Sequence, residues 1–575
     1  MNKVHNIALQ SDKTRPTGVL AHNVIDRWLL GIMESNPAIL DMFRQRELRP
    51  YRDMLPWSGE FAGKYLTSTG AVYRLTQRED LLEYGLLFAR QLAGCMGEDG
   101  YLGCFQKDCR LTGAYSQNPG SPGATWDAWG HYHAMTGFCD WFELTGESWL
   151  LEAAERIAGL FVSTFYTGKK KLSDMLSPVV NLSPYHSMAR LSRLTGNKQY
   201  LEFAKQVEQD LATAMKDSDY LTHALAGMEY FQNAQPRWEA LHIVMGFAEM
   251  ARITGQERYR TALLQVFDSI RRTDVHNTGA FSTREAAIGT PFVNEAIETC
   301  CVVAYQALAV EALYLSGRCD VADQLESAHY NAILGSFSPS GRWSTYNTPM
   351  DGVRNANFHD IHFQCRPGSP ELNCCSVNAP RAIGLFADWA ITEDEKGTYI
   401  NTYEPLKGRS SHGVSVAVEG AYPAPGQVRV TAVSDTAADL LLRIPAWSKH
   451  TRVLLDGQTI LPVAGEYLAL HRRWQGETID LQFDFTPYTT DGGGEYQDKK
   501  SIYCGPLLLG CDLADNGGLD WDNLPAVSMT LLQKTAPITE NGAMGLRLPN
   551  GMVLRPFADL GWSGSRYKTW LAVTK

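Results

Sequence analysis

The stretch Ala240-Leu-His-Ile-Val-Met-Gly-Phe-Ala-Glu-Met-Ala-Arg-Ile-Thr-Gly255 decides the fold of most of this chain. Its apolar residues recur at the three- and four-residue spacing of an amphipathic helix. The glycine after the last turn is a typical helix C-cap, because glycine readily adopts the left-handed backbone found there. The stretch therefore predicts a helix with a defined C-terminal end.

The closing phrase of this helix recurs along the chain. Leu-Thr-Gln begins at residue 75, Leu-Thr-Gly at 144 and 194, Ile-Thr-Gly at 253 and Leu-Ser-Gly at 315. Most copies precede a second helical pattern, as in Asn197-Lys-Gln-Tyr-Leu-Glu-Phe-Ala-Lys205. The interval of roughly 50 to 70 residues fits a helical hairpin with inserted loops. We expect five or six hairpins to close into an (α/α)₆ toroid; an open helical solenoid is the alternative.

The pattern changes after about residue 385. Short runs that alternate between apolar and polar residues begin at 413, 427 and 478, and a short β-rich run begins at 439; Gly, Pro and Asp turns separate these runs. We predict an α+β multidomain chain with an (α/α)₆ toroid catalytic barrel over 1–385 and β-sandwich domains over 386–490 and 491–575. Asp491-Gly-Gly-Gly494 marks the expected seam, and strands near 395–410 are considered as a completion of the second sandwich.

Composition bounds the function. The 575 residues are 44% hydrophobic and 20% charged, with a formal net charge of -11, so we expect neither nucleic acid nor anionic membranes as partners. The N-terminus lacks the apolar core of a signal peptide and no apolar run reaches membrane-spanning length, so we expect a cytoplasmic protein. The twelve cysteines are irregularly spaced, which favours metal or thiol chemistry over a disulfide framework.

Two thiol clusters stand out: Glu298-Thr-Cys-Cys301 and the adjacent pair Cys374-Cys375. Each lies at or just before a helical pattern, where the helix dipole favours anionic ligands. A carboxylate and three or four thiols can fill a tetrahedral zinc site. The alternative is that these cysteines are ordinary buried core residues.

Other stretches carry possible catalytic or binding residues. Glu285 lies in a segment of poor periodicity and is a candidate general acid, unless it is simply a solvated surface carboxylate. Polar aromatic stretches suited to sugars are Trp126-Asp-Ala-Trp-Gly-His-Tyr-His133, Pro56-Trp-Ser-Gly-Glu-Phe61 and, more weakly, Ser344-Thr-Tyr-Asn-Thr-Pro349. No phosphate loop, dinucleotide fingerprint or Gly-x-Ser-x-Gly elbow is present in the sequence.

These motifs resemble those of the cysteine-dependent β-L-arabinofuranosidases of glycoside hydrolase families 127 and 146. The most specific elements are Glu298-Thr-Cys300 and Cys374-Cys375-x-x-Asn-x-x-Arg381. The likeness covers most of the chain and continues through Asp99-Gly-Tyr-Leu-Gly103, Tyr399-Ile-Asn-Thr-Tyr403, Arg443-Ile-Pro-Ala-Trp447, Asp456-Gly457 and Lys500-Ser-Ile-Tyr-Cys-Gly-Pro506.

The resemblance implies an (α/α)₆ barrel, β-sandwich domains and retaining hydrolysis with a cysteine nucleophile. By position, Cys374 would attack the anomeric carbon, and Glu285 would protonate the leaving oxygen and then activate water. Zn²⁺ would be held by Glu298, Cys300, Cys374 and Cys375, and would keep the nucleophile ionised at neutral pH.

The same resemblance implies that His131 and Tyr346 lie at the sugar. We add Trp126 and Glu60 as substrate-binding candidates from their aromatic stretches. The expected reaction is release of β-L-arabinofuranose, or a related rare pentofuranose, from plant-derived oligosaccharides. A homodimer is also considered.

The chain departs from the family pattern in three places. Cys301 stands where a small residue is expected, and the stretches Asn181–His186 and Pro236–His242 lack expected pocket residues. Two rival functions are kept: a sugar isomerase or epimerase using His131, His186 and His242, and a non-catalytic carbohydrate-binding protein in which zinc only staples the barrel.

Overall fold

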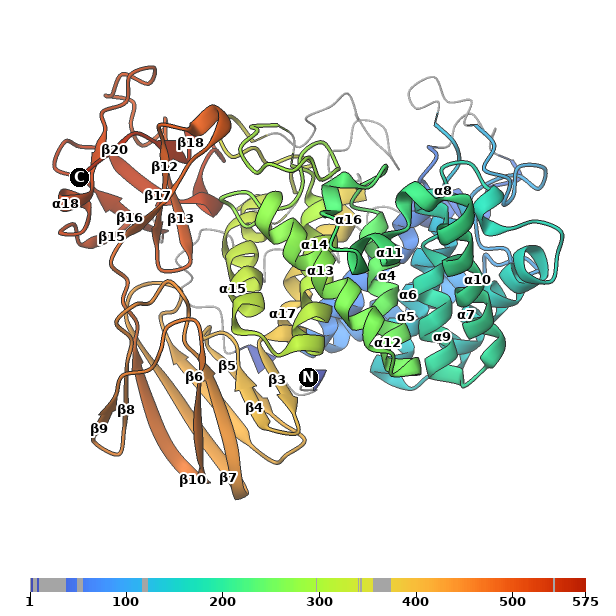
Figure 1. Ribbon diagram of the computed structural model, residues 1–575, viewed down its shortest axis with the longest axis horizontal. Helices are drawn as coiled ribbons and strands as arrows, with labels where there is room; N and C mark the ends of the chain where they lie inside the picture. Colours follow the sequence, from blue (N-terminus) through green and yellow to red (C-terminus); the bar gives the residue numbers. More distant parts are fainter. Residues whose placement is uncertain are drawn as a thin grey trace.

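The computed structural model has a helical domain followed by two β-sheet domains, which confirms the predicted fold class (Figure 1). The two sheets lie on one side of the helical domain, one above the other in this view. The residues that the structure describes are 2–3, 8–9, 38–48, 55–115, 123–295, 297–339, 341, 344–354, 374–540 and 543–575.

Six helices form a closed inner ring within the described residues. Each contacts the next in chain order, and the last contacts the first, which excludes the open solenoid. They are α4 (Glu60–Thr76), α6 (Asp127–Thr145), α9 (Pro184–Thr195), α12 (Ala240–Thr254), α14 (Thr299–Ser316) and α16 (Cys374–Gly384).

An outer helix follows each of the first five inner helices and packs against it. The outer helices are α5 (Glu79–Ala93), α7 (Ser148–Phe161), α10 (Lys198–Ala214), α13 (Glu257–Thr273) and α15 (Cys319–Ser327). Shorter helices are α3 (Ala38–Arg44), α8 (Pro178–Asn181), α11 (Tyr220–Leu225), α17 (Phe386–Trp389) and α18 (Met529–Leu532).

The repeated phrase ends the first five inner helices as predicted. Gly146, Gly196, Gly255 and Gly317 are left-handed C-caps with φ of 74°, 73°, 66° and 62°, and Gln77 does the same at 54°. Since inner and outer helices alternate as antiparallel hairpins, all inner helices begin at the same end of the ring.

One inner helix is apolar enough to be mistaken for a membrane span. α14 passes that test by length and composition, contrary to the sequence-based expectation, but 78% of it is buried inside the protein. A helix surrounded by other helices must be apolar on every side. α14 is therefore a core helix of the ring.

The first sheet holds ten strands and includes two from the N-terminus, β1 and β2, which pair with β3 and β5. The long strands β7 and β10 form its centre, with β6 and β4 pairing along successive parts of β7. The strands are β1 (Asn2–Lys3), β2 (Ala8–Leu9), β3 (Ile391–Asp394), β4 (Gly397–Ile400), β5 (Leu406–Arg409), β6 (Ser415–Gly420), β7 (Gln427–Arg443), β8 (Arg452–Leu455), β9 (Gln458–Ile460) and β10 (Tyr467–Gln482).

The second sheet corrects two details of the predicted boundaries. It already begins at β11, before the expected seam at 491, and β4 and β5 belong to the first sheet, so strands near 395–410 do not complete the second. The other strands are β11 (Tyr488–Asp491), β12 (Lys500–Cys504), β13 (Leu507–Asp512), β15 (Pro537–Glu540), β16 (Ala543–Arg547), β17 (Val553–Pro556), β18 (Tyr567–Lys568), β19 (Trp570–Leu571) and, in a separate pair, β14 (Val527–Ser528) with β20 (Val573–Thr574).

A buried ion cluster joins the ring to the first sheet. The guanidinium of Arg443, at the end of β7, is fully buried and pairs with Asp323 and Glu326 of α15. Glu326 also accepts hydrogen bonds from Tyr422 and from the indole of Trp447. We call these five residues the seam cluster.

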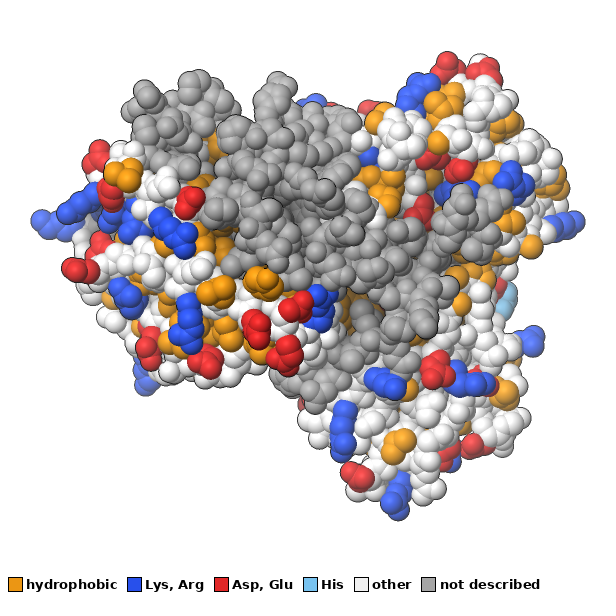
Figure 2. All heavy atoms as spheres, turned by 180° about the vertical axis from the view of Figure 1, so that it is seen from behind, with side chains coloured by type: hydrophobic (Ala, Val, Ile, Leu, Met, Phe, Trp, Pro, Cys, Tyr) orange, Lys and Arg blue, Asp and Glu red, His pale blue; other side chains and the backbone are white. Residues whose placement is uncertain are grey.

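The outer surface shows no concentration of one charge in the view of Figure 2. Lys and Arg side chains alternate with Asp and Glu over the described residues of that face.

Candidate active site

Two inner helices begin with the predicted metal ligands. Glu298 is the N-cap of α14 and Cys300 lies in its first turn, whereas α16 starts at Cys374 and Cys375. One ligand atom from each of these four buried side chains lies within 4.8 Å of the other three. The unpaired N–H groups of a helix start favour negative charge, so both helices favour ionised thiols here. We call these four residues the ligand cluster.

The three thiols of the ligand cluster differ in how easily they ionise. Burial raises the pKa of Cys374 and Cys375 well above its usual range. Burial opposes ionisation of Cys300 too, but hydrogen bonds from Cys374 and Cys375 and the charge of Lys64 hold its pKa well below the usual range. The cluster therefore favours a thiolate at Cys300, solvated by two neighbouring thiols.

The donor set fits a thiophilic metal. Three sulfurs and one carboxylate match the tetrahedral coordination of Zn²⁺, whereas Mg²⁺ and Ca²⁺ prefer oxygen ligands. Cys375 donates to Glu298 Oε1 at 3.4 Å and Cys374 to the same oxygen at 3.9 Å, so the four groups already converge. These residues could hold a metal ion without rearrangement of the helices.

Cys301 lies beside the ligand cluster but outside it. Its Sγ donates to Glu298 Oε2 at 3.5 Å, the oxygen opposite the one that Cys375 contacts. Burial and the charge of Glu298 raise the pKa of Cys301 well above its usual range. The extra cysteine therefore orients the carboxylate and stays a thiol.

A buried ion pair on α4 lies next to the ligand cluster and was missed in the sequence. Lys64 Nζ is 2.8 Å from Glu60 Oε1 and donates to Cys300 Sγ at 3.6 Å. Asn378 of α16 donates to the same sulfur at 3.4 Å. A Glu–Lys spacing of four inside an otherwise buried helix was the available signal.

Glu60 itself is buried, 2% exposed, and not at an open surface. Its other oxygen accepts a hydrogen bond from the indole N–H of Trp129, and burial raises its pKa to about 7. Both oxygens of the Glu60 carboxylate are thus engaged by protein groups. The structure shows no free oxygen of Glu60 for the sugar contact that the sequence suggested.

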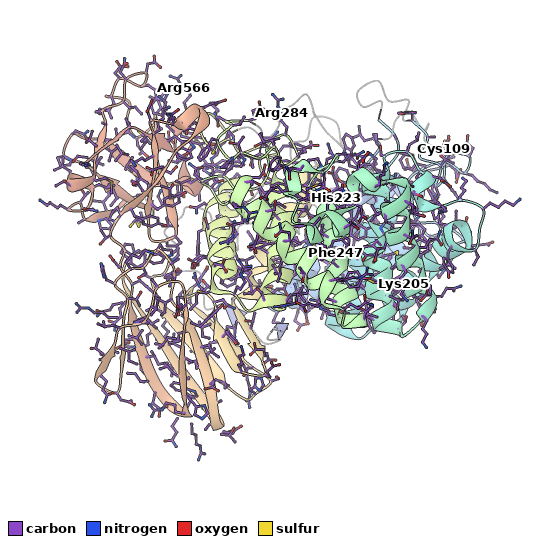
Figure 3. All side chains as sticks on the ribbon, viewed as in Figure 1. Cys109, Lys205, His223, Phe247, Arg284 and Arg566 are labelled. Carbon is purple, nitrogen blue, oxygen red and sulfur yellow. The ribbon has the colours of Figure 1, made fainter. Side chains whose placement is uncertain are left out.

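The predicted acid, Glu285, lies in a loop held by the start of α12. Arg237 donates to Glu285 Oε2 at 2.8 Å and also pairs with Glu239. Trp238 N–H donates to the backbone carbonyl of Glu285 at 3.1 Å. Glu285 has a φ of 66°, a left-handed conformation that is uncommon outside glycine and often found at functional sites. Figure 3 shows its neighbour Arg284 among loops at the upper edge of the helical domain.

Tyr346 connects Glu285 to the ligand cluster. Its hydroxyl donates to Glu285 Oε1 at 3.3 Å, while its backbone carbonyl accepts from Thr299 N–H at 2.9 Å. Burial and then the charges of Glu298, Cys374 and Glu285 raise its pKa well above the usual range. The phenol therefore remains a proton donor between the acid and the cysteines.

His131 is not brought to this group. Its Nδ1 donates to the Asp127 carbonyl at 2.8 Å and its Nε2 accepts from Leu102 N–H at 2.9 Å, so both ring nitrogens are used inside the fold. The structure therefore does not support the prediction that His131 contacts the sugar. His133, two residues later, has a buried Nε2 with no hydrogen-bond partner among the described residues.

Aromatic rings surround His133. Trp129 meets it edge-on at 4.3 Å between ring centroids and lies 5.7 Å from Trp238, whose buried indole N–H has no partner in the described part of the chain. Burial and then the charge of Lys64 lower the pKa of His133 well below its usual value. Trp126 is half-buried and stacks obliquely on Trp57, 5.5 Å away.

Two of the three histidines of the isomerase alternative, His186 and His242, share one hydrogen-bond partner. His186 and His242 both direct Nδ1 at the hydroxyl of Tyr132, at 3.0 and 2.7 Å. Burial lowers the pKa of His186 to about 3 and that of His242 well below the usual range. The polar residues of α4, α6, α9, α12, α14 and α16 thus meet near the N-terminal ends of the inner helices.

Comparisons with known proteins agree with this architecture. The family model described as "Beta-L-arabinofuranosidase, GH127 catalytic domain" matches residues 19–388, and the corresponding middle-domain model matches 397–485. A solved GH127 β-arabinofuranosidase superposes with a TM-score of 0.77 at 17% identity, over 100% of this chain and 98% of that one. No curated protein sequence matches the chain.

A GH127 β-L-arabinofuranosidase from Geobacillus stearothermophilus T6 gives a TM-score of 0.76 at 16% identity, with 96% of this chain and 98% of that chain covered. A further structure titled glycoside hydrolase gives 0.71 at 18% identity, with 94% and 95% covered. These identities show a shared fold, whereas the catalytic family model spans well over half the chain. The chain therefore belongs to glycoside hydrolase family 127, the β-L-arabinofuranosidase family, and is a glycosidase of that type.

Proposed function

We propose that this protein is a retaining glycosidase that releases β-L-arabinofuranose, or a related pentofuranose, from plant-derived oligosaccharides. Cys374 is its nucleophile and Glu285 its acid and base. The observation that carries the proposal is Tyr346, whose hydroxyl donates to Glu285 and whose backbone carbonyl accepts a hydrogen bond from Thr299, the residue between the ligand-cluster members Glu298 and Cys300. Membership of a glycosidase family favours this function over the isomerase and the binding protein.

Glu298, Cys300, Cys374 and Cys375 would hold Zn²⁺, which when bound keeps the coordinating sulfurs ionised at neutral pH. Glu285 then has two successive tasks. As the Cys374 sulfur forms its bond to the anomeric carbon, the bond to the leaving oxygen breaks and Glu285 protonates that oxygen. In the second half, Glu285 removes a proton from water, whose oxygen replaces sulfur at the anomeric carbon.

The loop geometry of Glu285 suits these two tasks. Arg237 and Tyr346 each donate to a different oxygen of the carboxyl group, which fixes its orientation. Its side chain is 29% exposed, so water can reach it for the second step. Two buried ring nitrogens without partners among the described residues, His133 Nε2 and Trp238 Nε1, are proposed to bind sugar hydroxyls, because buried polar groups need partners.

The test is a panel of p-nitrophenyl pentofuranosides and pentopyranosides, with zinc content measured on the same preparation. We expect release of p-nitrophenol from a β-L-arabinofuranoside or a related furanoside, about one zinc per chain, and a first product with retained anomeric configuration by NMR. Inverted product would contradict the covalent mechanism, and activity confined to pyranosides would contradict the proposed substrate class. The cytoplasmic location and the homodimer stay predictions.

A further inference from the structure

The ammonium group of Lys64 is buried although Lys64 is neither a candidate metal ligand nor the candidate acid. Its side chain is 0% exposed, and its Nζ lies 2.8 Å from Glu60, 3.6 Å from Cys300 Sγ and 5.2 Å from the ring centroid of Trp238. Lysine is almost never fully buried unless it is paired. Both the ion pair with Glu60 and the contact of Lys64 with the Cys300 sulfur therefore need a physical reason.

Stability alone does not explain the pair. Two charges taken out of water lose hydration, and apolar residues of similar volume often replace a buried ion pair without loss of stability. The surrounding helix α4 is buried along most of its length, so apolar side chains would fit the environment. The pair therefore points to a role at its contact with Cys300.

The pair is oriented so that its positive end faces the sulfur. Glu60 is tied through one oxygen to Lys64 and through the other to the indole N–H of Trp129. Lys64 is the member that contacts Cys300, and Asn378 donates a second N–H to the same sulfur. Cys300 therefore receives two nitrogen donors from two different helices.

The net charge of the ligand cluster with a metal ion bound gives a physical reason for the contact between Lys64 and Cys300. One carboxylate and three thiolates carry four negative charges, and a divalent ion returns two, which leaves two in a dry interior. A fixed ammonium beside one sulfur offsets part of that excess. Groups that contact metal ligands in this way orient them and strengthen metal binding.

We propose that Lys64, oriented by Glu60, is a positioning residue that fixes Cys300 as a permanent metal ligand and strengthens zinc binding by the ligand cluster. The inference rests on the zinc site proposed above. It assigns Glu60 to the metal site through Lys64, in place of the sugar contact suggested by the sequence. Cys300 would thereby serve only as a ligand, in contrast to Cys374, whose sulfur also forms the proposed bond to the sugar.

The first test measures zinc affinity by competition with a fluorescent chelator for the wild type, Lys64→Met and Lys171→Met. Lys171 also pairs with a buried carboxylate, Asp210 at 2.7 Å, but in a different part of the barrel. We expect Lys64→Met to bind zinc about 10- to 100-fold more weakly, as for other residues that support metal ligands. Lys171→Met should match the wild type.

A double variant separates positioning from folding. Lys64→Met alone leaves Glu60 buried without its cation, which destabilises the chain whatever the role of Lys64. Glu60→Gln/Lys64→Met removes both charges and keeps a carbonyl oxygen for Trp129. We expect this double variant to recover the apo-protein thermal stability lost in Lys64→Met, while its zinc affinity stays as weak as that of the single variant.

A spectroscopic measurement checks the contact at the sulfur. In the Co²⁺-substituted protein, the thiolate-to-metal charge-transfer band should shift in Lys64→Met and in the double variant but not in Lys171→Met. Wild-type zinc affinity in either Lys64 variant, with an unchanged Co²⁺ spectrum, would overturn this inference alone. A wild-type chain that takes up no zinc would overturn the proposed metal site and this inference with it.

Discussion

Two buried polar clusters in this chain look alike and behave differently. In the seam cluster, Arg443 faces two carboxylates, Asp323 and Glu326, and its third nitrogen donates to the Asn401 carbonyl. In the candidate active site, the cation Lys64 pairs with the carboxylate of Glu60 and also contacts Cys300, which belongs to the ligand cluster. The seam cluster satisfies its charges with groups of the chain, whereas the ligand cluster accumulates anionic donors.

This difference separates buried charges that stabilise the fold from buried charges that serve a functional site. Asp323 and Glu326 use their oxygens on Arg443, Tyr422, Trp447 and the Ala446 N–H, so the seam cluster has a partner for each group named here. The ligand cluster gathers one carboxylate and three sulfurs within 4.8 Å of one another, an arrangement suited to a bound cation. The predictions below alter one cluster at a time and follow activity, zinc and stability separately.

The largest effect is expected at Cys374. Cys374→Ser should lower kcat by about 10⁴-fold or more, the scale seen when a hydrolase loses its nucleophile. Cys139→Ser, at a buried free cysteine of α6, should leave kcat unchanged. Steady-state kinetics on the best aryl furanoside measures both. Comparable kcat in Cys374→Ser and the wild type would rule out the nucleophile.

Metal removal should follow in size. Dialysis against a chelator should reduce activity to background, and one equivalent of Zn²⁺ should restore it, because the proposed nucleophile Cys374 loses the charge that keeps it ionised. The apparent Tm should fall as well, since an ion bound only by the native state stabilises it. Full activity with less than about one tenth of an equivalent of bound metal would contradict the zinc site.

Loss of the acid should cost less than loss of the nucleophile. Glu285→Gln should lower kcat by about 10²- to 10⁴-fold, the usual contribution of general acid–base catalysis, with zinc content unchanged. Added azide should partly restore turnover of an activated aryl glycoside, because it needs no general base. Glu295→Gln is the matched control, since Glu295 pairs with Arg284 in the same loop. Equal loss in both variants would assign the effect to the loop and not to the acid.

The seam cluster should respond in stability alone. Arg443→Met leaves Asp323 and Glu326 buried without their cation, and we expect a loss of about 3–5 kcal/mol in the free energy of unfolding. Thermal and denaturant unfolding measure it. At temperatures where the variant is folded, zinc affinity and kcat should equal those of the wild type; a selective loss of zinc would erase the distinction between the clusters.

The smallest effect is expected at Cys301. Cys301→Ala removes one thiol that donates to Glu298 Oε2, so zinc affinity should fall by about 2- to 10-fold, the value of one hydrogen bond. Zinc stoichiometry should stay at one per chain. A much larger loss, or altered thiolate bands in the Co²⁺-substituted variant, would show that Cys301 is itself a ligand.

Much of the fold could be predicted because its signals are local. The glycine C-caps at Gly146, Gly196, Gly255 and Gly317 mark the ends of inner helices, and period-two runs mark the sheets. The attachment of β1 and β2 to the first sheet could not be predicted, since it pairs segments separated by almost 400 residues. Such pairings leave no periodic signal.

The site was predictable where residue type restricts chemistry. The ligand cluster comes together as expected. Two pairs of adjacent cysteines are uncommon in a sequence, and a metal site is one of the few structures that uses them. Lys64 was missed, since a Glu–Lys spacing of four usually marks an exposed helix face and its signal here depends on the burial of the helix. The hydrogen bonds that use both ring nitrogens of His131 inside the fold could not be predicted, because they depend on the packing of α6 against its neighbours.

One measurement tests the central claim most directly. The protein is mixed with an activated aryl furanoside that reacts quickly and releases its sugar slowly, then quenched in acid and digested for mass spectrometry. The account predicts a single pentosyl adduct on the peptide that contains Cys374, absent when the metal has been removed. An adduct on Glu285, or rapid turnover without any adduct, would contradict a cysteine nucleophile.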